Sequence, residues 1–225
     1  MDEKKIAAEY SVNYIEDGMI VGLGTGSTVS LMLNKLSERV KSGLNITAVS
    51  SSQATTKLAS SLGIKLKQLS EVDEIDVTID GADEVDENLN GIKGGGGALL
   101  YEKIIASNSK KNIWIIDSSK FVKTLGKFPL PVEIIQFGYT QLCAKFENNG
   151  FNPTLRVKGP LKYTTDNNNY IVDLKMDRIP DPVSLDIILK SFPGVVETGL
   201  FYNIADDVIV GVGRDVKIIT KKKRA

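Results

Sequence analysis

The sequence predicts an α/β protein: a doubly wound, mostly parallel, Rossmann-like sheet with a second, smaller α+β domain of ferredoxin-like plan. In the first half of the chain, short apolar runs alternate with segments whose apolar residues recur every three or four positions. After Pro129 the order changes, and strand-like segments follow one another with a single helix between them. We therefore expect a Rossmann-like catalytic domain over 1–128 plus 205–225 and a small domain over 129–204.

The individual elements of the first domain follow from these periods. We expect strands over 19–23, 45–50, 75–79 and 112–117. We expect helices over 4–16, 29–40 and 54–62, of which the last two end near Gly43 and Gly63. The run 112–117 is apolar and β-branched throughout, which is typical of a parallel strand that is buried on both faces.

The second domain has a different pattern. Strands are expected over 154–158 and 170–176, with a turn at 166–169 between them. A helix is expected over 183–190, because Pro182 suits the first position of a helix. Another strand is expected over 195–201. The runs 207–213 and 216–219 form either a closing hairpin or a return to the main sheet.

Composition excludes several classes of protein. The 225 residues include 28 Lys plus Arg, 28 Asp plus Glu, no His and one Cys. Balanced charge argues against a nucleic-acid partner, and the basic run 221–224 is expected to be a solvated terminus. Without histidine there is no Ser-His-Asp or Cys-His nucleophile and no His-ligated metal. Cys143 alone forms no disulfide, and we expect it to be a small buried hydrophobe.

Hydropathy indicates a soluble, cytoplasmic protein. No apolar stretch reaches the ~18 residues of a membrane span, and no apolar signal core follows Met1. We expect no membrane partner, no metal and no cofactor. Acid–base chemistry would then use carboxylates, lysine, tyrosine or backbone groups.

Four polar or glycine-rich segments each follow a predicted strand. They are 22–28, 50–53, 80–83 and 117–120. Because the carboxyl ends of parallel strands share one edge of an open α/β sheet, we expect these segments to converge on one crevice.

The segment 22–28 is a glycine-rich turn between a strand and a helix. Free backbone N–H groups at a helix start suit a phosphate. A dinucleotide fingerprint would need a third glycine at Ser27, and no Gly-Lys-Ser/Thr sequence is present for a Walker A loop. The residues Thr25, Gly26, Ser27 and Thr28 suit a phosphate monoester better. The alternative is a tight turn with an ordinary helix cap.

The acidic stretch that follows resembles a calcium loop only superficially. Five residues nearly match EF-hand spacing: Asp76, Thr78, Asp80, Gly81 and Glu87. Thr78 stands where an Asp or Asn is needed, and a strand is predicted where an EF-hand has a helix. We therefore do not expect calcium.

Within this stretch, the position of each acid relative to the strand end decides its expected role. Asp80 and Asp83 lie closest to the strand end and are expected in the crevice. Glu84, Asp86 and Glu87 are expected in a solvated loop.

The run Lys93-Gly-Gly-Gly-Gly97 leads directly into a helical segment that contains Glu102. A backbone without Cβ atoms lets a ligand approach its N–H groups. Glu102 lies in an apolar stripe near the helix start, where desolvation would suit it to act as a general base at neutral pH. The alternative is a surface glutamate on a frayed first turn.

Together these features suit proton transfer on a phosphorylated sugar. One carboxylate can move a proton between adjacent carbons through an enediolate, while lysine and backbone N–H groups stabilise the developing oxyanion.

Five motifs in this order and spacing resemble the type A ribose-5-phosphate isomerase family. They are Gly24-Thr-Gly-Ser-Thr28, Asp80-Gly-Ala-Asp-Glu84, Lys93-Gly-Gly-Gly96, Glu102 and Asp117-x-Ser-Lys120. The resemblance runs along the whole chain and implies interconversion of D-ribose 5-phosphate and D-ribulose 5-phosphate in the non-oxidative pentose phosphate pathway, without metal or cofactor.

The resemblance also implies roles for residues. Glu102 would be the proton acceptor, and Asp80, Asp83 and Lys93 would assist ring opening and bind the sugar oxygens. The expected substrate-binding residues are Thr25, Gly26, Ser27, Thr28, Asp80, Gly81, Ala82, Asp83, Lys93, Gly94, Gly95, Gly96 and Lys120. A homodimer or homotetramer is implied, with the small domain serving assembly or acting as a lid.

Two alternatives come from other classes. A non-catalytic, effector-sensing sugar-phosphate-binding domain occurs in transcription regulators, but the sheet begins by Met19 and leaves no room for a helix-turn-helix module before it. A coenzyme A transferase would need its catalytic carboxylate on a different loop. Turnover distinguishes both from an isomerase.

Overall fold

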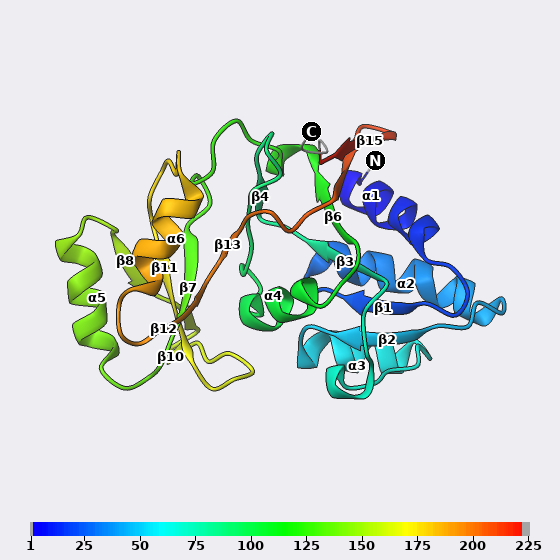
Figure 1. The fold of residues 1–225 in the computed structure, drawn as a ribbon, viewed down its shortest axis with the longest axis horizontal. Helices are drawn as coiled ribbons and strands as arrows, with labels where there is room; N and C mark the ends of the chain where they lie inside the picture. The colour runs from blue at the N-terminus through cyan, green and yellow to red at the C-terminus, as the bar shows by residue number, and fades with distance from the viewer. Residues whose placement is uncertain (1, 222–225) are drawn as a thin grey trace. The chain divides into compact units, whose positions relative to one another are not determined.

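The structure is a computed structural model that describes residues 2–221 (Figure 1). The chain forms two compact units. Within the described residues, unit 1 contains 2–82, 101–121 and 203–221, and unit 2 contains 83–100 and 122–202. The basic run expected as a solvated terminus lies, apart from Lys221, outside the described residues.

The core of unit 1 is a six-stranded sheet in the order β15-β14-β6-β3-β1-β2 (Figure 1). Its strands are β1 (Ile20–Leu23), β2 (Thr47–Ser50), β3 (Val77–Gly81), β6 (Asn112–Asp117), β14 (Asp207–Val212) and β15 (Asp215–Thr220). All neighbours are parallel except β14 and β15, which are antiparallel. The predicted α/β class is confirmed. The last segment both returns to the sheet and closes it with a hairpin.

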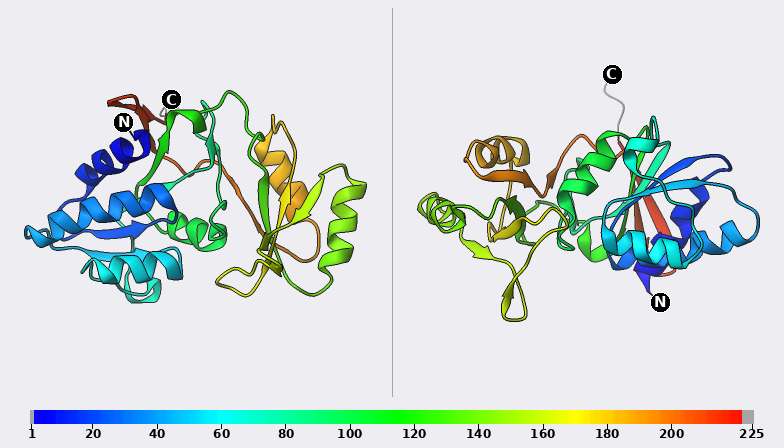
Figure 2. Two further views of the ribbon diagram at one scale, coloured as in Figure 1. Left: turned by 180° about the vertical axis from the view of Figure 1, so that it is seen from behind. Right: turned by 90° about the horizontal axis from the view of Figure 1, so that it is seen from below.

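Helices cover both faces of this sheet. They are α1 (Glu3–Ser11), α2 (Ser27–Lys41), α3 (Gln53–Ser61) and α4 (Leu99–Ser107), with short 3₁₀ turns η1 (Val12–Tyr14), η2 (Leu69–Glu71) and η3 (Ser118–Lys120). Successive strand residues point to opposite faces. Val21 and Leu23 therefore pack with α1 and α2, whereas Ile20 and Val49 pack with Ile105 of α4. Figure 2 shows α2 and α4 on opposite sides of the strands.

The main sheet of unit 2 is antiparallel, with the order β12-β7-β11-β8. Its elements follow one another as β7 (Leu130–Ile134), α5 (Tyr139–Asn148), β8 (Pro153–Leu155), β11 (Tyr170–Leu174), α6 (Pro182–Lys190) and β12 (Val195–Thr198). This βαββαβ order is the expected ferredoxin-like plan. Phe146 of α5 is fully buried in its core, and Cys143 is half-buried beside it rather than fully buried.

Several segments divide differently from the sequence-based expectation. The strand expected over 195–201 becomes β12 and β13 (Leu200–Phe201), which belong to different sheets. The strand expected over 154–158 becomes β8 and β9 (Val157–Lys158), and β9 pairs only with β10 (Leu161–Lys162).

The segment 83–100 clusters with unit 2, although the expected boundary lay near 128. It contains β4 (Glu84–Val85) and β5 (Gly91–Ile92), which form a small sheet with β13. Leu200 pairs with Ile92, and that pairing holds the segment in the second unit. Over 2–221, no helix is both long and apolar enough to span a membrane.

Candidate functional site

The loop between β1 and α2, which we call the cradle, has local features that suit an anion. Gly26 immediately precedes α2 and has φ 117°, a conformation that favours glycine. Ser27 and Thr28 then begin a helix of fifteen residues, so its first N–H groups and their partial positive charge lie at this loop. Gly26 and Ser27 are exposed, whereas Thr28 is buried.

Asp80, at the carboxyl end of β3, holds this loop in place. Its Oδ1 accepts hydrogen bonds from the N–H groups of Thr25 (3.0 Å) and Gly81 (2.7 Å). A Cβ on Gly24 would lie 1.9 Å from the same oxygen, so only glycine allows the carboxylate to approach. The buried Asp80 carboxylate therefore orients the backbone of the loop between β1 and α2 through at least one of its oxygens.

The hydroxyl of Thr25 joins the loop to the end of β2. Its Oγ1 lies 2.8 Å from Ser51 Oγ and donates to Ser52 Oγ at 2.9 Å. Thr55 Oγ1 donates to Gly24 O at 2.8 Å. Three hydroxyl side chains from the start of α3 and the two residues before it thus brace the cradle, and none of the three was among the predicted binding residues.

Lys120 completes the convergence of the four segments. Its Nζ donates to the carbonyl oxygen of Ala82 at 2.8 Å, which joins the segment after β6 to the segment after β3. All four polar segments therefore meet at the carboxyl edge of the unit 1 sheet, as the strand order predicted.

Glu102 is buried near this edge, with an exposed fraction of 4%. Ile75 N–H donates to Asn108 O, so the end of α4 lies at the start of β3 and the beginning of α4 lies toward the carboxyl edge. Ile105 packs over Gly22, where a Cβ would lie 2.9 Å from its Cγ2. Glu102 lies three residues before Ile105. It is therefore on the same face of α4 and one helical turn nearer the carboxyl edge of the sheet. The alternative of a surface glutamate on a frayed turn is wrong.

The glycine run of unit 2 is held by Asp83. Asp83 Oδ2 accepts a hydrogen bond from Gly95 N–H at 2.8 Å, and a Cβ on Gly95 would lie 2.7 Å from Asp83 Oδ1. Gly97 N–H donates to Gly94 O at 2.9 Å, which closes a turn. We call the segment Gly94–Gly97 the glycine loop.

Lys93 is buried to an exposed fraction of 2%. Its Nζ lies 5.3 Å from the centroid of the Phe201 ring, within the range of a cation–π interaction. Lys93 N–H donates to the carbonyl oxygen of Gly199, the residue between β12 and β13. A buried ammonium interacts strongly with any negative charge that develops beside it, because the local dielectric constant is low.

Two residues that sequence reasoning missed contact the carbonyl groups of the glycine loop. Arg156 Nη1 donates to Gly94 O at 2.8 Å and to Gly95 O at 3.2 Å. Tyr163 Oη donates to Gly96 O at 3.2 Å. Burial raises the pKa of the Tyr163 phenol, which keeps its hydroxyl protonated as a donor. Their separation of more than fifty residues from the loop left no local sequence signal.

The expectation of a solvated loop for three acids is wrong for two of them. Glu84 is buried and accepts hydrogen bonds from Gly126 N–H and Phe128 N–H, both at 2.7 Å. Asp86 is buried and accepts from the backbone of Asn88 and Asn90. Both carboxylates stabilise loops of unit 2, and Glu87 is exposed as expected.

Comparison with known proteins shows the family of this chain. A family model described as ribose 5-phosphate isomerase A (phosphoriboisomerase A) matches residues 47–215. A protein named ribose-5-phosphate isomerase A from Streptococcus thermophilus (strain CNRZ 1066) is 50% identical over 226 residues, which cover 99% of this chain and 100% of the relative. A similarly named protein from Bifidobacterium adolescentis is 54% identical over 212 residues, which cover 92% of this chain and 90% of the relative.

The fold agrees as well. A solved structure of D-ribose-5-phosphate isomerase in complex with phospho-erythronic acid has a TM-score of 0.93 at 41% identity, and the match covers 97% of this chain and 98% of that one. The motifs, the sheet order and the similarity over nearly the whole chain lead to one conclusion. The chain belongs to the ribose 5-phosphate isomerase A family.

Proposed function

We propose that this protein interconverts D-ribose 5-phosphate and D-ribulose 5-phosphate, an aldose–ketose isomerisation of the non-oxidative pentose phosphate pathway. The observation that carries the proposal is the 50% identity, over 99% of the chain, to a protein named ribose-5-phosphate isomerase A. The geometry of unit 1 supports it, because an anion cradle and a buried glutamate lie toward the same edge of one sheet.

The phosphate of the substrate is proposed to bind at the start of α2. Thr25, Gly26, Ser27 and Thr28 supply backbone N–H groups and hydroxyls there, and the helix end carries a partial positive charge. The ammonium of Lys120 is proposed to add a positive charge to this phosphate site.

Glu102 is proposed to be the base. Its carboxylate takes the proton from C2 of the open-chain aldose, the C2–H electrons form the C1=C2 bond, and the carbonyl electron pair moves to O1 as an enediolate. Glu102 then returns the proton to C1, C2=O forms, and the proton on O2 moves to O1. The reaction relocates protons only and needs no redox cofactor.

The remaining predicted residues are proposed to assist these steps. Lys93 and the N–H groups of the glycine loop would stabilise the charge on O1 and O2. Asp80, Gly81, Ala82 and Asp83 would bind sugar hydroxyls and assist ring opening. The burial of Lys93 supports its role, because charge stabilisation is strongest away from water.

The test is ribulose 5-phosphate formation from ribose 5-phosphate with EDTA present, with Glu102→Gln measured beside the wild type. We expect wild-type turnover, and a loss of about 10³-fold or more in kcat for the variant, because the proton transfer loses its base. Binding of phospho-erythronic acid to the variant, by calorimetry, is expected to remain within about threefold, since the base acts mainly in the transition state.

Two outcomes would contradict the proposal. A wild-type protein that binds ribose 5-phosphate without converting it would be an effector-binding protein. A Glu102→Gln protein that loses ligand binding together with turnover would assign Glu102 a structural role.

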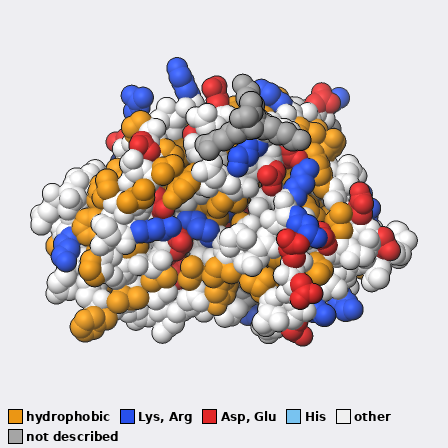
Figure 3. Space-filling model, viewed as in Figure 1, with side chains coloured by type: hydrophobic (Ala, Val, Ile, Leu, Met, Phe, Trp, Pro, Cys, Tyr) orange, Lys and Arg blue, Asp and Glu red, His pale blue; other side chains and the backbone are white. Residues whose placement is uncertain are grey.

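We also propose that the protein is a homodimer or homotetramer that assembles through unit 2. Hydrophobic side chains are visible on the surface over this unit (Figure 3). Phe137 is 92% exposed. Ile187 and Val183 lie on one outer face of α6, and they are 64% and 39% exposed. A second copy of the chain is proposed to cover them. A cytoplasmic location is proposed as well, because a charged sugar phosphate does not cross a bilayer unaided.

A further inference from the structure

The glycine loop lacks the side chains that usually determine a backbone conformation. Four successive glycines have access to nearly all of φ/ψ space, and a loop of this kind loses much conformational entropy when it is held in one state. Two of the four, Gly94 and Gly97, have positive φ values of 101° and 82°. Apart from the turn hydrogen bond between Gly97 N–H and Gly94 O, its conformation is therefore determined by contacts from outside the loop.

The carbonyl side of the loop provides such contacts. The guanidinium of Arg156 binds the oxygens of Gly94 and Gly95, and the hydroxyl of Tyr163 binds the oxygen of Gly96. Three consecutive carbonyls are thereby directed to two side chains of the same unit. A Cβ on Gly97 would lie 2.1 Å from Tyr163 Oη, so the phenol packs directly on the loop backbone.

Arg156 is itself held rigidly. Its Nε donates to Asp173 Oδ2 at 2.9 Å and its Nη2 to Asp173 Oδ1, a two-point pairing that fixes the plane of the guanidinium. Asp173 lies within β11, opposite Pro131 of β7 and Thr154 of β8. The side chains of Arg156 and Asp173 are 15% and 21% exposed. The third guanidinium nitrogen, Nη1, is the one that reaches the loop.

Arg156 and Tyr163 also act as a pair. They flank the β9–β10 hairpin, and Tyr163 N–H donates to Arg156 O at 2.9 Å. The guanidinium carbon lies 5.8 Å from the centroid of the phenol ring. The base of one hairpin therefore contacts three of the four carbonyl groups of the glycine loop.

Directing a carbonyl also directs the next N–H group. In a planar trans peptide the C=O and the following N–H point in opposite directions. The first peptide shows this: Gly94 O accepts from Arg156, whereas Gly95 N–H donates to Asp83. By the same geometry, the contact of Arg156 with Gly95 O turns the N–H of Gly96, an exposed residue, away from the guanidinium.

We propose that Arg156, assisted by Tyr163, is a positioning residue that orients the glycine loop so that Gly96 N–H can donate to the negative oxygen that develops on the sugar. This inference rests on the proposed isomerase function and goes beyond it, since both residues would act through the backbone of the glycine loop. Arginine is required at position 156, because a lysine has no second and third donor nitrogen to bind Asp173 and the loop together.

The test compares Arg156→Ala, Arg156→Lys and Tyr163→Phe with the wild type in steady-state isomerisation. For both Arg156 variants we expect kcat to fall about tenfold or more while KM stays within about threefold, because transition-state donors are misdirected and the phosphate cradle in unit 1 is unchanged. Tyr163→Phe, which keeps the ring and removes one hydrogen bond, is expected to lose about threefold in kcat. The control is Arg178→Ala, an exposed arginine of the same unit.

Binding measurements separate positioning from stability. For Arg156→Ala we expect the Kd of phospho-erythronic acid, whose carboxylate mimics the developing oxyanion, to rise about tenfold, and that of inorganic phosphate to stay within about twofold. Unchanged kcat and phospho-erythronic acid affinity would overturn the inference. Equal losses for both ligands that parallel a fall in Tm would also overturn it. If Arg156→Ala does not fold, the same measurements of kcat, ligand affinity and Tm on Tyr163→Phe test the inference.

The wild-type arm separates this inference from the proposed function. A wild-type protein that neither converts ribose 5-phosphate nor binds phospho-erythronic acid overturns the proposed function, and the positioning role with it. A wild-type protein that is active, beside Arg156 and Tyr163 variants with unchanged kcat, overturns the positioning role alone.

Discussion

At the scale of single residues, glycine and aspartate are used together twice. Asp80 accepts the N–H of Thr25 in unit 1, and Asp83 accepts the N–H of Gly95 in unit 2. In each case a Cβ on the loop would lie less than 3 Å from the carboxylate, at Gly24 in the first loop and at Gly95 in the second. Each loop therefore needs glycine for close approach of an acid.

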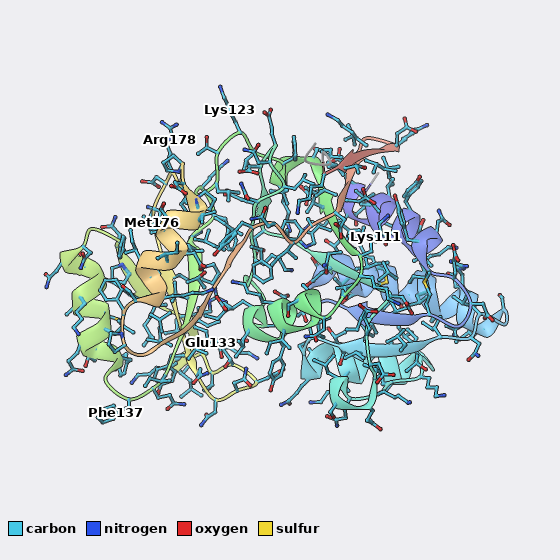
Figure 4. The ribbon with its side chains drawn as sticks, viewed as in Figure 1. Lys111, Lys123, Glu133, Phe137, Met176 and Arg178 are labelled. Atoms are coloured by element: carbon cyan, nitrogen blue, oxygen red, sulfur yellow. The ribbon has the colours of Figure 1, made fainter. Side chains whose placement is uncertain are left out.

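Lys120 allows a test of the phosphate site at this scale. We expect Lys120→Ala to raise KM about tenfold and to change kcat less than about threefold, because a group that binds the phosphate stabilises the ground state and the transition state equally. The measurement is steady-state isomerisation. Lys123→Ala is the control, since Lys123 is exposed and extends away from the ribbon (Figure 4). A fall in kcat at constant KM would contradict a phosphate-binding role.

At the scale of elements, a carboxylate joins β1 to the segment that leads into β3. Asp76 Oδ2 accepts from Ile20 N–H at 2.8 Å, and its Oδ1 accepts from Lys110 Nζ at 2.9 Å. These interactions, first the backbone hydrogen bond and then the ammonium, hold the pKa of Asp76 below its ordinary value. The ionised carboxylate thus helps to align the two strands that carry the Thr25 loop and Asp80.

The lowered pKa predicts a pH-dependent stability. The contribution of Asp76 is fully present above the carboxyl pKa of the unfolded chain and is lost as pH falls through the lower pKa of the folded protein. We expect Asp76→Ala to lower the free energy of unfolding by about 1–2 kcal/mol at neutral pH, because Ile20 N–H loses its acceptor. The difference from wild type should shrink as pH falls below the ordinary range of a carboxyl pKa.

Urea unfolding at several pH values measures this difference. Asp73→Ala, a change at an exposed acid in the same loop, is the control and should leave stability within about 0.5 kcal/mol. A difference for Asp76→Ala that stays constant with pH would show that the carboxylate charge is not involved.

At the scale of the whole molecule, each unit has its own core, and unit 2 also exposes large apolar side chains. Unit 2 exposes Phe137 and the outer face of α6, whereas its interior holds buried carboxylates such as Glu133, which is 1% exposed (Figure 4). Glu133 Oε1 accepts from Thr165 and Asn169, both at 2.9 Å. The unit thus buries hydrogen-bonded polar groups and leaves large apolar side chains in water, which favours an interface with another chain.

Sedimentation and size-exclusion chromatography test that interface. We expect the wild type to behave as a dimer or tetramer and Ile187→Asp to shift it toward smaller species, because a buried unpaired carboxylate is costly at an interface. Glu87→Asp, at an exposed acid, is the matched control. A wild type that remains a monomer at micromolar concentration would contradict the proposal of a homo-oligomer.

Local sequence patterns were sufficient for much of the fold and of the predicted site. The alternation of apolar periods indicated the parallel sheet, and the glycines and hydroxyls after the first strand indicated a tight turn into a helix. Each of these signals lies within one turn or one strand, where the period of burial and the requirements of helix starts operate. The apolar stripe around Glu102 likewise indicated the burial of its side chain, because residues on one helix face share one environment.

Contacts between distant segments were decided only in the tertiary structure. The pairing of Leu200 with Ile92 and the contacts of Arg156 and Tyr163 with the glycine loop were not predicted. Each depends on strand register and side-chain packing over more than fifty residues of chain, and a periodic pattern contains no information on which distant segment supplies the partner. A short-range pattern indicates which face of a helix or strand is buried. Only the tertiary structure determines which other element packs against that face.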